Sequence, residues 1–184
     1  MDLLDKIRVL AIRAMQLGLG PGEYPGDTVI DEVLGPGEVM IDGRRTLMFG
    51  SNNYLGLTFH PEVMAAAQAA ITQYGTATTG SRIANGTFRL HRDLEIEFAQ
   101  LFEKRLGMIF TTGHQANLSV IAGLCGSDDV VLIDAESHAS VYDGARLSGA
   151  QLLWFRHNSP EHLERKLKRL PTGERNRIVV VEGL

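Results

Sequence analysis

The sequence predicts an α/β fold in which a mostly parallel sheet carries helices on its faces. Short apolar runs alternate along the chain with longer segments whose apolar residues recur at helical spacing, and this alternation is typical of βαβ units. The runs are continuously apolar, as strands buried on both faces are. They are Met108–Phe110, Val130–Ile133, Leu152–Phe155 and Ile178–Val181.

Residues 1–55 are predicted to form an N-terminal arm made of a helix, a linker and a β-hairpin. Apolar residues recur on one helical face at the start of the chain, which predicts a docking helix; a peripheral contact with a membrane is the alternative. The segment 18–26 is rich in Gly and Pro, as linkers are. Asp42-Gly43 separates two apolar runs, which is typical of a hairpin turn. The helical face comprises Leu3, Ile7, Leu10, Ala14 and Leu17.

Proline and glycine residues mark two of the later helices. Pro61 suits the first turn of a helix because the N–H that it lacks is not needed there, and Gly75 ends that helix. Ser159-Pro160 supplies the N-cap and first residue of another helix, which Pro171 stops.

Between them, the apolar stripe from Leu94 to Phe102 predicts a helix that ends at Gly107. The expected strand Met108–Phe110 follows it and runs into the segment Thr111–Asn117, which is predicted to turn from strand to helix. The chain finishes on an expected strand followed by Glu182 and the turn residue Gly183, with nothing left to cover the next face of the sheet. We therefore expect residues 56–184 to be the first part of a larger domain that is incomplete at its C-terminal end.

Composition excludes several classes of protein. The 184 residues are 44% hydrophobic and 22% charged, which is ordinary for a globular protein, and a net charge of −4 gives no electrostatic case for binding nucleic acid. No apolar stretch is long enough for a transmembrane helix, and acidic and basic residues interrupt any signal-peptide core. The single cysteine, Cys125, excludes an internal disulfide and fits a cytoplasmic location. The histidines do not have metal-ligand spacing.

Two segments carry candidate chemistry. His138 follows the strand Val130–Ile133, where open α/β sheets bind ligands, although a lone histidine there is more often structural than catalytic. Gly113 and His114 lie in the predicted strand-to-helix turn, whose free N–H groups and helix dipole suit a phosphate. A phosphate site and an imidazole on the same sheet edge together suggest a phosphorylated, planar cofactor.

These two segments also resemble a known family, together with Gly50–Leu57 and Thr78–Thr87. In that order the four motifs are similar to the N-terminal part of the α-oxoamine synthases, which are pyridoxal-phosphate enzymes of fold type I, the aspartate aminotransferase fold. Within the family the chain most resembles the bacterial serine palmitoyltransferase branch. The resemblance runs from about Val39 to Leu184. It implies a homodimer with its site at the interface, which condenses L-serine with a long-chain acyl-CoA and releases CO2.

The resemblance also implies roles for individual residues. His138 would stack on the cofactor ring and bind the substrate carboxylate, while Gly113 and His114 would hold the cofactor phosphate. His114 departs from the family, which usually has Tyr or Phe at this position. Asn53, or its neighbour Asn52, would donate to the substrate carboxylate, although asparagines in loops are usually turn formers. Ser81 and Arg82, in a loop with weak anion-binding potential of its own, are further substrate-binding candidates.

The family's aldimine-forming lysine has no counterpart in this sequence. We therefore expect the 184 residues alone to be inactive and the lysine to lie further along the parent protein. Two alternatives stay open. The parent could be another α-oxoamine synthase, of the 8-amino-7-oxononanoate synthase or 2-amino-3-ketobutyrate CoA ligase type. It could also be a catalytically silent scaffold subunit, but such subunits often alter the stacking histidine, which is His138 here.

Overall fold

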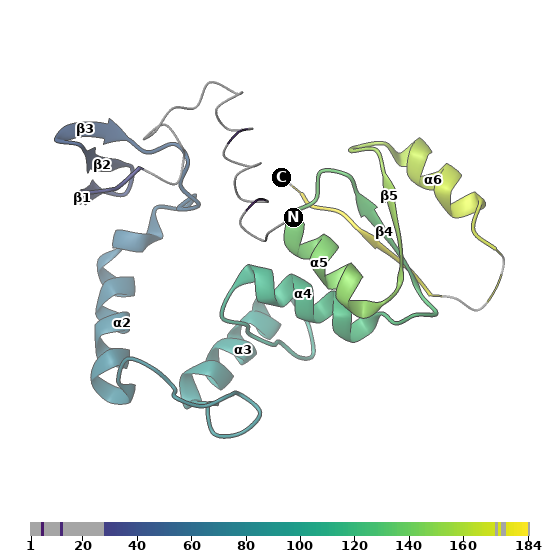
Figure 1. The fold of residues 1–184 in the computed structure, drawn as a ribbon. Coiled ribbons are helices and arrows are strands. Elements are labelled where there is room, and N and C mark those ends of the chain that lie inside the picture. The colour runs from purple at the N-terminus through teal and green to yellow at the C-terminus, as the bar shows by residue number, and fades with distance from the viewer. Residues whose placement is uncertain (1–4, 6–11, 13–27, 172, 174–175, 184) are drawn as a thin grey trace. The chain divides into compact units, whose positions relative to one another are not determined.

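The structure of the protein is a computed structural model that describes residues 5, 12, 28–171, 173 and 176–183 (Figure 1). The chain divides into two compact units, residues 1–81 and residues 82–184. The residues of the expected N-terminal helical face and of the linker 18–26 lie outside the described residues; between residues 3 and 26 the structure describes Asp5 and Ile12. The boundary expected between residues 55 and 56 stays a prediction.

The first unit contains a three-stranded antiparallel sheet in the order β1-β2-β3. The predicted hairpin is confirmed, and its two turn residues, Asp42 and Gly43, have φ values of 49° and 69°, as a type I′ turn requires. The first strand was not predicted, because a four-residue strand with three exposed positions leaves no periodic pattern. The strands are β1 (Glu32–Gly35), β2 (Glu38–Ile41) and β3 (Arg44–Leu47).

The helix expected after Pro61 is α2 (Pro61–Tyr74), which follows the short 3-10 helix η2 (Leu57–Phe59). Pro61 occupies the first helical position, and Gly75 ends the helix with a φ of 78° while its N–H donates to the Ile71 carbonyl oxygen at 2.8 Å. Both end residues therefore act as the sequence predicts.

The second unit is built on a parallel three-stranded sheet in the order β5-β4-β6. The central strand is buried along its whole length, which explains its continuously apolar sequence. The predicted α/β fold class is confirmed by this sheet and its helices. The strands are β4 (Val130–Asp134), β5 (Gln151–Phe155) and β6 (Arg177–Val180).

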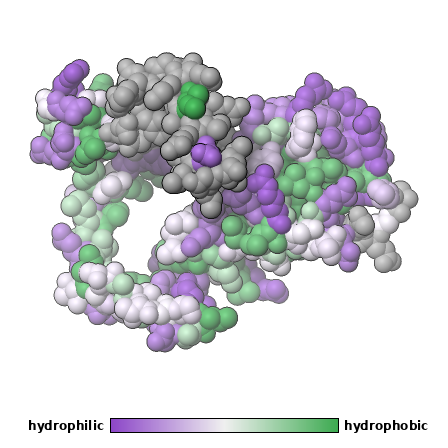
Figure 2. Space-filling model, in the orientation of Figure 1, coloured by the Kyte–Doolittle hydropathy of each residue, from purple (hydrophilic) through white to green (hydrophobic). Residues whose placement is uncertain are grey.

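Alternate residues of β4 pack into two separate cores, one on each face of the sheet. Val131 and Ile133 pack with residues of α4 (Gly113–Leu124) and α5 (Ala139–Ser148). Val130 and Leu132 pack against the apolar side of α6 (Pro160–Lys168), whose outer side chains are hydrophilic (Figure 2). Among the described residues, no helix has both the length and the apolar character needed to cross a membrane.

Two expectations about the segment between residues 94 and 110 are wrong. The helix α3 (Arg89–Leu101) ends before Gly107, because Glu103 takes a left-handed conformation with φ 52°. Gly107 serves a different need, since a Cβ there would lie 2.5 Å from the Glu95 carbonyl oxygen. Met108–Phe110 is not a strand: no described strand pairs with it, and the Ile109 N–H donates to the Glu95 carboxylate at 3.3 Å instead.

Close packing of α4 on α5 depends on Gly144. A Cβ at this position would lie 3.1 Å from the Ile121 Cβ and 3.1 Å from the Leu118 Cα, both on the facing helix. We expect Gly144→Ala to lower the free energy of unfolding by about 1–3 kcal/mol, as overpacking does. Chemical denaturation measures the change.

Gly123→Ala is the matched control, because Gly123 is also helical but has open space around its Cβ position. That substitution should leave stability unchanged or raise it by up to about 1 kcal/mol, since alanine favours the helix. Equal destabilisation by the two substitutions would contradict the packing argument.

Candidate functional site

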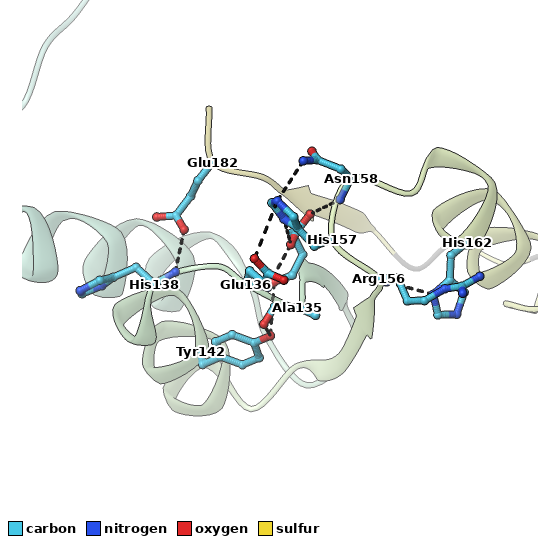
Figure 3. A network of polar contacts seen from close by, with 10 residues as sticks. Ala135, Glu136, His138, Tyr142, Arg156, His157, Asn158, His162 and Glu182 are labelled. Atoms are coloured by element: carbon cyan, nitrogen blue, oxygen red, sulfur yellow. Dashed lines mark hydrogen bonds and ion pairs between the residues drawn. The ribbon is translucent and has the colours of Figure 1, made fainter. Parts of the chain in front are cut away.

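All three parallel strands of the second unit end at the same edge of the sheet, and polar residues follow each of them. Asp134 ends β4. His138 lies beyond the end of β4, His157 follows β5, and Glu182 follows β6 (Figure 3). Because ligands of open α/β sheets bind outside the carboxyl ends of the strands, this edge is the candidate site.

The buried carboxylate of Asp134 organises two of the loops at this edge. It accepts hydrogen bonds from the Glu136 N–H at 3.0 Å and the Asn158 N–H at 3.2 Å, and it lies 2.9 Å from Nδ1 of His157. An ionised carboxylate only accepts, so Nδ1 of His157 carries the donated proton. Asp134 therefore supports this loop by hydrogen bonds. The Ser137 hydroxyl is buried without a partner among the described residues.

These contacts change the ionisation of both partners. The hydrogen bond from the Glu136 N–H, with further bonds from His157 and Asn158, holds the pKa of Asp134 below its ordinary value. The hydrogen bond to Asp134 raises the pKa of His157, and the Glu136 carboxylate, 3.9 Å from Nε2 of His157, adds to this. The hydrogen bond between His157 and Asp134 thus stabilises the loop that leads to His138.

His138 is the N-cap of α5, and its main chain and side chain have separate partners. Its N–H donates to the Glu182 carboxylate at 2.6 Å, which joins the end of β6 to the start of α5 (Figure 3). Its Nδ1 lies 2.8 Å from the Ser140 hydroxyl and 3.2 Å from the Ser140 backbone nitrogen, which donates to it. The imidazole is therefore fixed at one nitrogen.

The N-terminus of α4 supplies backbone donors. Thr112 caps the helix by accepting from the Gln115 N–H at 3.1 Å. The N–H groups of Gly113 and His114 donate to no acceptor within the part of the chain that the structure describes, and the space beside Gly113 is open. Free amides at a helix N-terminus can bind an anion such as a phosphate.

The structure brings His114 and His138 together. Their ring centroids are 6.2 Å apart and the rings meet edge to face. His114 Nε2 also lies 4.0 Å from the Asp143 carboxylate. The free amides of α4 and the imidazole of His138 therefore belong to one local surface, which can bind an anion beside an aromatic donor.

Three of the other four predicted site residues are hydrogen-bonded to neighbouring parts of the fold. Asn53 accepts from the Thr58 N–H at 3.3 Å and donates to the Pro36 carbonyl oxygen at 3.4 Å, so its amide stabilises the fold of the first unit. Asn52 accepts from the Tyr54 hydroxyl at 3.3 Å, and Ser81 is exposed.

Arg82 forms a 2.7 Å ion pair with Glu95, a carboxylate that is almost fully buried. Hydrogen bonding from Arg82 is the main cause that lowers the pKa of Glu95. The structure thus gives Arg82 a part in anchoring α3, and the substrate-binding roles of Asn52, Asn53, Ser81 and Arg82 stay predictions.

Sequence reasoning missed three residues that contact His138 or its neighbours. Glu182 could have been found from its place after a third parallel strand, as His138 was. Ser140 and Asn117 leave no comparable pattern: Ser140 lies two residues into a helix, and Asn117 comes from a different helix and reaches Ser140 at 3.1 Å. The described residues contain no cluster that could hold a metal ion.

Comparison with known proteins places this site in context. Residues 44–184 match the model of the family described as aminotransferase class I and II. The chain is 48% identical over 163 residues to a serine palmitoyltransferase of Caulobacter vibrioides, covering 89% of this chain and 40% of that protein. It is 40% identical over 183 residues to a serine palmitoyltransferase of Sphingomonas paucimobilis, covering 100% of this chain and 43% of that protein. The chain thus spans less than half the length of these relatives.

Solved structures agree with the sequence matches. Serine palmitoyltransferase of Sphingomonas wittichii superposes with a TM-score of 0.88 at 42% identity, over 97% of this chain and 45% of that one. A high-resolution structure of serine palmitoyltransferase with pyridoxal phosphate (as an internal aldimine) gives a TM-score of 0.92 at 39% identity, over 100% of this chain and 46% of that one. An 8-amino-7-oxononanoate synthase of Francisella tularensis gives a TM-score of 0.55 at 25% identity, over 68% and 34%. The predicted aspartate-aminotransferase-like fold is confirmed.

The contact between Asp134 and His157 predicts a pH-dependent stability. Because folding raises the pKa of His157 above its ordinary 6.5, the contribution of this histidine is complete below about pH 6.5 and is lost as pH rises through the raised value. His157→Gln should therefore flatten the decline of Tm with rising pH near neutrality. Thermal melts across this range measure it.

His162→Gln is the control of opposite sign. Burial lowers the pKa of His162, so its contribution to stability grows as pH rises toward 6.5. The His162→Gln protein should lose this rise and keep the decline that His157 causes. A His157→Gln profile parallel to that of the unmodified protein would contradict the role of the Asp134 contact.

Proposed function

Because this chain belongs to the aminotransferase class I and II family, we propose that its parent protein is a pyridoxal 5'-phosphate-dependent transferase. The observation that carries the proposal is the pairing of free helix amides with a fixed imidazole at the carboxyl edge of the sheet. The free N–H groups can donate to a phosphate, and the imidazole can lie against the planar ring of the cofactor.

The proposed reaction is the decarboxylative condensation of L-serine with a long-chain acyl-CoA, which releases CoA and CO2. The relatives named serine palmitoyltransferase, at up to 48% identity, support this substrate pair. We further propose a cytoplasmic homodimer whose site lies at the subunit interface.

The residues present fit the cofactor. The N–H groups of Gly113 and His114 would donate to its phosphate, and the positive end of α4 would add to the attraction. His138 would lie against the ring. When bound, pyridoxal phosphate supplies an electron sink for the negative charge that develops at the substrate α-carbon.

His138 would also orient the substrate by donating a hydrogen bond from Nε2 to its carboxylate. Asn53, with Asn52, Ser81 and Arg82 as further candidates, would contribute to substrate binding. No described lysine contacts His138: Lys166 lies over the Trp154 ring, and Lys168 pairs with Glu164. The lysine that this chemistry requires would come from residues outside this chain, so the 184 residues alone should show no turnover.

The test of substrate identity is a visible absorbance titration of the parent protein with L-serine, glycine and L-alanine in turn. We expect a saturable change in the cofactor absorbance with L-serine and little change with the other two. A preference for another amino acid would reject the serine assignment while keeping the family. The absence of any cofactor band would reject the enzyme proposal and favour a catalytically silent scaffold subunit.

The second candidate is another α-oxoamine synthase, of the 8-amino-7-oxononanoate synthase or 2-amino-3-ketobutyrate CoA ligase type. The structural match to the Francisella tularensis 8-amino-7-oxononanoate synthase supports this second candidate. L-alanine in place of L-serine as the saturating amino acid would support the first of these types, and glycine the second.

Substitution of His138 separates its two proposed roles. His138→Phe keeps an aromatic ring but removes the donor, so L-serine should bind about 10–100-fold more weakly, as expected for losing a hydrogen bond to a charged group worth about 1.5–3 kcal/mol. His138→Ala should lose the ring as well and also weaken cofactor retention. Serine titration and cofactor dialysis measure the two effects. Unchanged serine affinity in His138→Phe would rule out the carboxylate contact.

A further inference from the structure

Ser140 lies between two polar side chains from different helices. Its side chain is completely buried in the first turn of α5. The hydroxyl oxygen is 2.8 Å from Nδ1 of His138 and 3.1 Å from the Asn117 side-chain nitrogen, which donates to it from α4. The three side chains form a continuous chain of hydrogen bonds that begins on α4 and ends on the imidazole.

The backbone N–H of Ser140 sets which group donates in each of these hydrogen bonds, because it can never act as an acceptor. The Ser140 N–H points at Nδ1 of His138 at 3.2 Å, and a backbone N–H can only donate. Nδ1 must therefore present a lone pair and carry no proton. The Ser140 hydroxyl, 2.8 Å from the same nitrogen, then donates its proton to Nδ1 and is left to accept from the amide of Asn117.

We propose that Asn117 and Ser140 are positioning residues that hold His138 as the tautomer with its proton on Nε2. A neutral imidazole whose Nδ1 accepts two hydrogen bonds can carry its proton only on the other nitrogen. Nε2 then always carries a proton that it can donate. The two contacts of Nδ1 with Ser140 also fix the rotation of the ring. The consequence for catalysis, a donor always ready for the substrate carboxylate, rests on the proposed function.

Helix capping alone does not account for Asn117. An N-cap needs one acceptor for an N–H of the first turn, and the bond from the Ser140 backbone to Nδ1 already provides it. The amide of Asn117 does not touch α5's backbone in any described contact; it acts on the hydroxyl alone. It donates to one lone pair of the Ser140 oxygen, and this favours the orientation in which the hydroxyl proton points to Nδ1.

The test reads the tautomer directly, in the intact parent protein without substrate, by 15N NMR of labelled histidine. The two ring nitrogens of a neutral imidazole differ strongly in shift according to which carries the proton, and His138→Gln identifies the signals by their loss. We expect His138 to show a proton-bearing Nε2 and a proton-free Nδ1. A proton on Nδ1, or an even mixture, would overturn the proposal.

Asn117→Asp replaces the amide nitrogen that donates to Ser140 with a carboxylate oxygen that can only accept, and it hardly changes the shape of the side chain. This substitution should reverse the direction of the hydrogen bonds from residue 117 to His138. The carboxylate accepts the Ser140 proton, so the hydroxyl presents a lone pair to Nδ1 and favours a proton there. We expect the Nε2 tautomer to lose its dominance in this variant. Gln115→Glu is the matched control, an amide-to-acid change two residues away on α4 whose oxygen still accepts from the Thr111 hydroxyl. It should leave the tautomer unchanged, and an equal shift in both variants would assign the effect to charge alone and overturn the proposal.

If the Asn117→Asp protein folds poorly, the tautomer of His138 can be measured in a Ser140→Ala protein instead. Loss of the hydroxyl leaves only the backbone N–H on Nδ1, so the tautomer preference should weaken, and an unchanged preference would reject the role of the side chains. L-serine binding then separates the two hypotheses. A changed tautomer with weaker serine binding supports both, whereas a changed tautomer with unchanged serine binding supports the positioning role and rejects the proposed carboxylate contact of His138.

Discussion

Burial of β4 on both faces and along both edges sets the position of the candidate site. The strand lies between β5 and β6, and all five of its residues are buried. Because both neighbours run parallel to it, the three strands deliver their following loops to one edge. The side chains of His138, His157 and Glu182 come from those loops, so their proximity is a consequence of strand direction rather than of closeness in sequence.

Asp134 converts that proximity into a fixed arrangement. As the last residue of the buried strand it cannot move independently of the core, and its carboxylate takes donors from the loop after β4 and the loop after β5. Glu182 does the same from the third strand by binding the His138 N–H. Two carboxylates thus connect three loops through hydrogen bonds.

Sequence patterns predicted the parts of this structure that depend on local rules. Proline and glycine at the ends of α2, the Asp42-Gly43 turn and three of the four strands expected in the second unit follow from backbone preference and apolar runs, and these were found. Gly107 misled the prediction because its lack of a side chain serves close approach to Glu95, a tertiary contact that local rules do not contain. Met108–Phe110 has the composition of a strand, but composition does not supply the neighbour that a strand requires.

The same division applies to the site. His138, Gly113 and His114 could be proposed because they follow apolar runs, whereas the bond between Asn117 and Ser140 joins residues 23 apart on two helices and has no sequence pattern. Arg82 and Asn53 were proposed for ligands, yet both side chains are hydrogen-bonded within their own units. Polar residues in Gly-rich loops serve the fold as readily as they serve a ligand, and only the contacts distinguish the two.

The bond from the His138 N–H to Glu182 spans 44 residues of chain, and this separation bears on how the protein is made. Synthesis proceeds from the N-terminus, and α5 can form as soon as its own residues are available. Its N-cap, His138, nevertheless lacks this carboxylate until β6 and the residues after it have been added and β6 has paired with β4. The anchoring of His138 at the sheet edge therefore has to wait for Glu182, and a nascent chain that stops before residue 182 carries the imidazole without its carboxylate anchor.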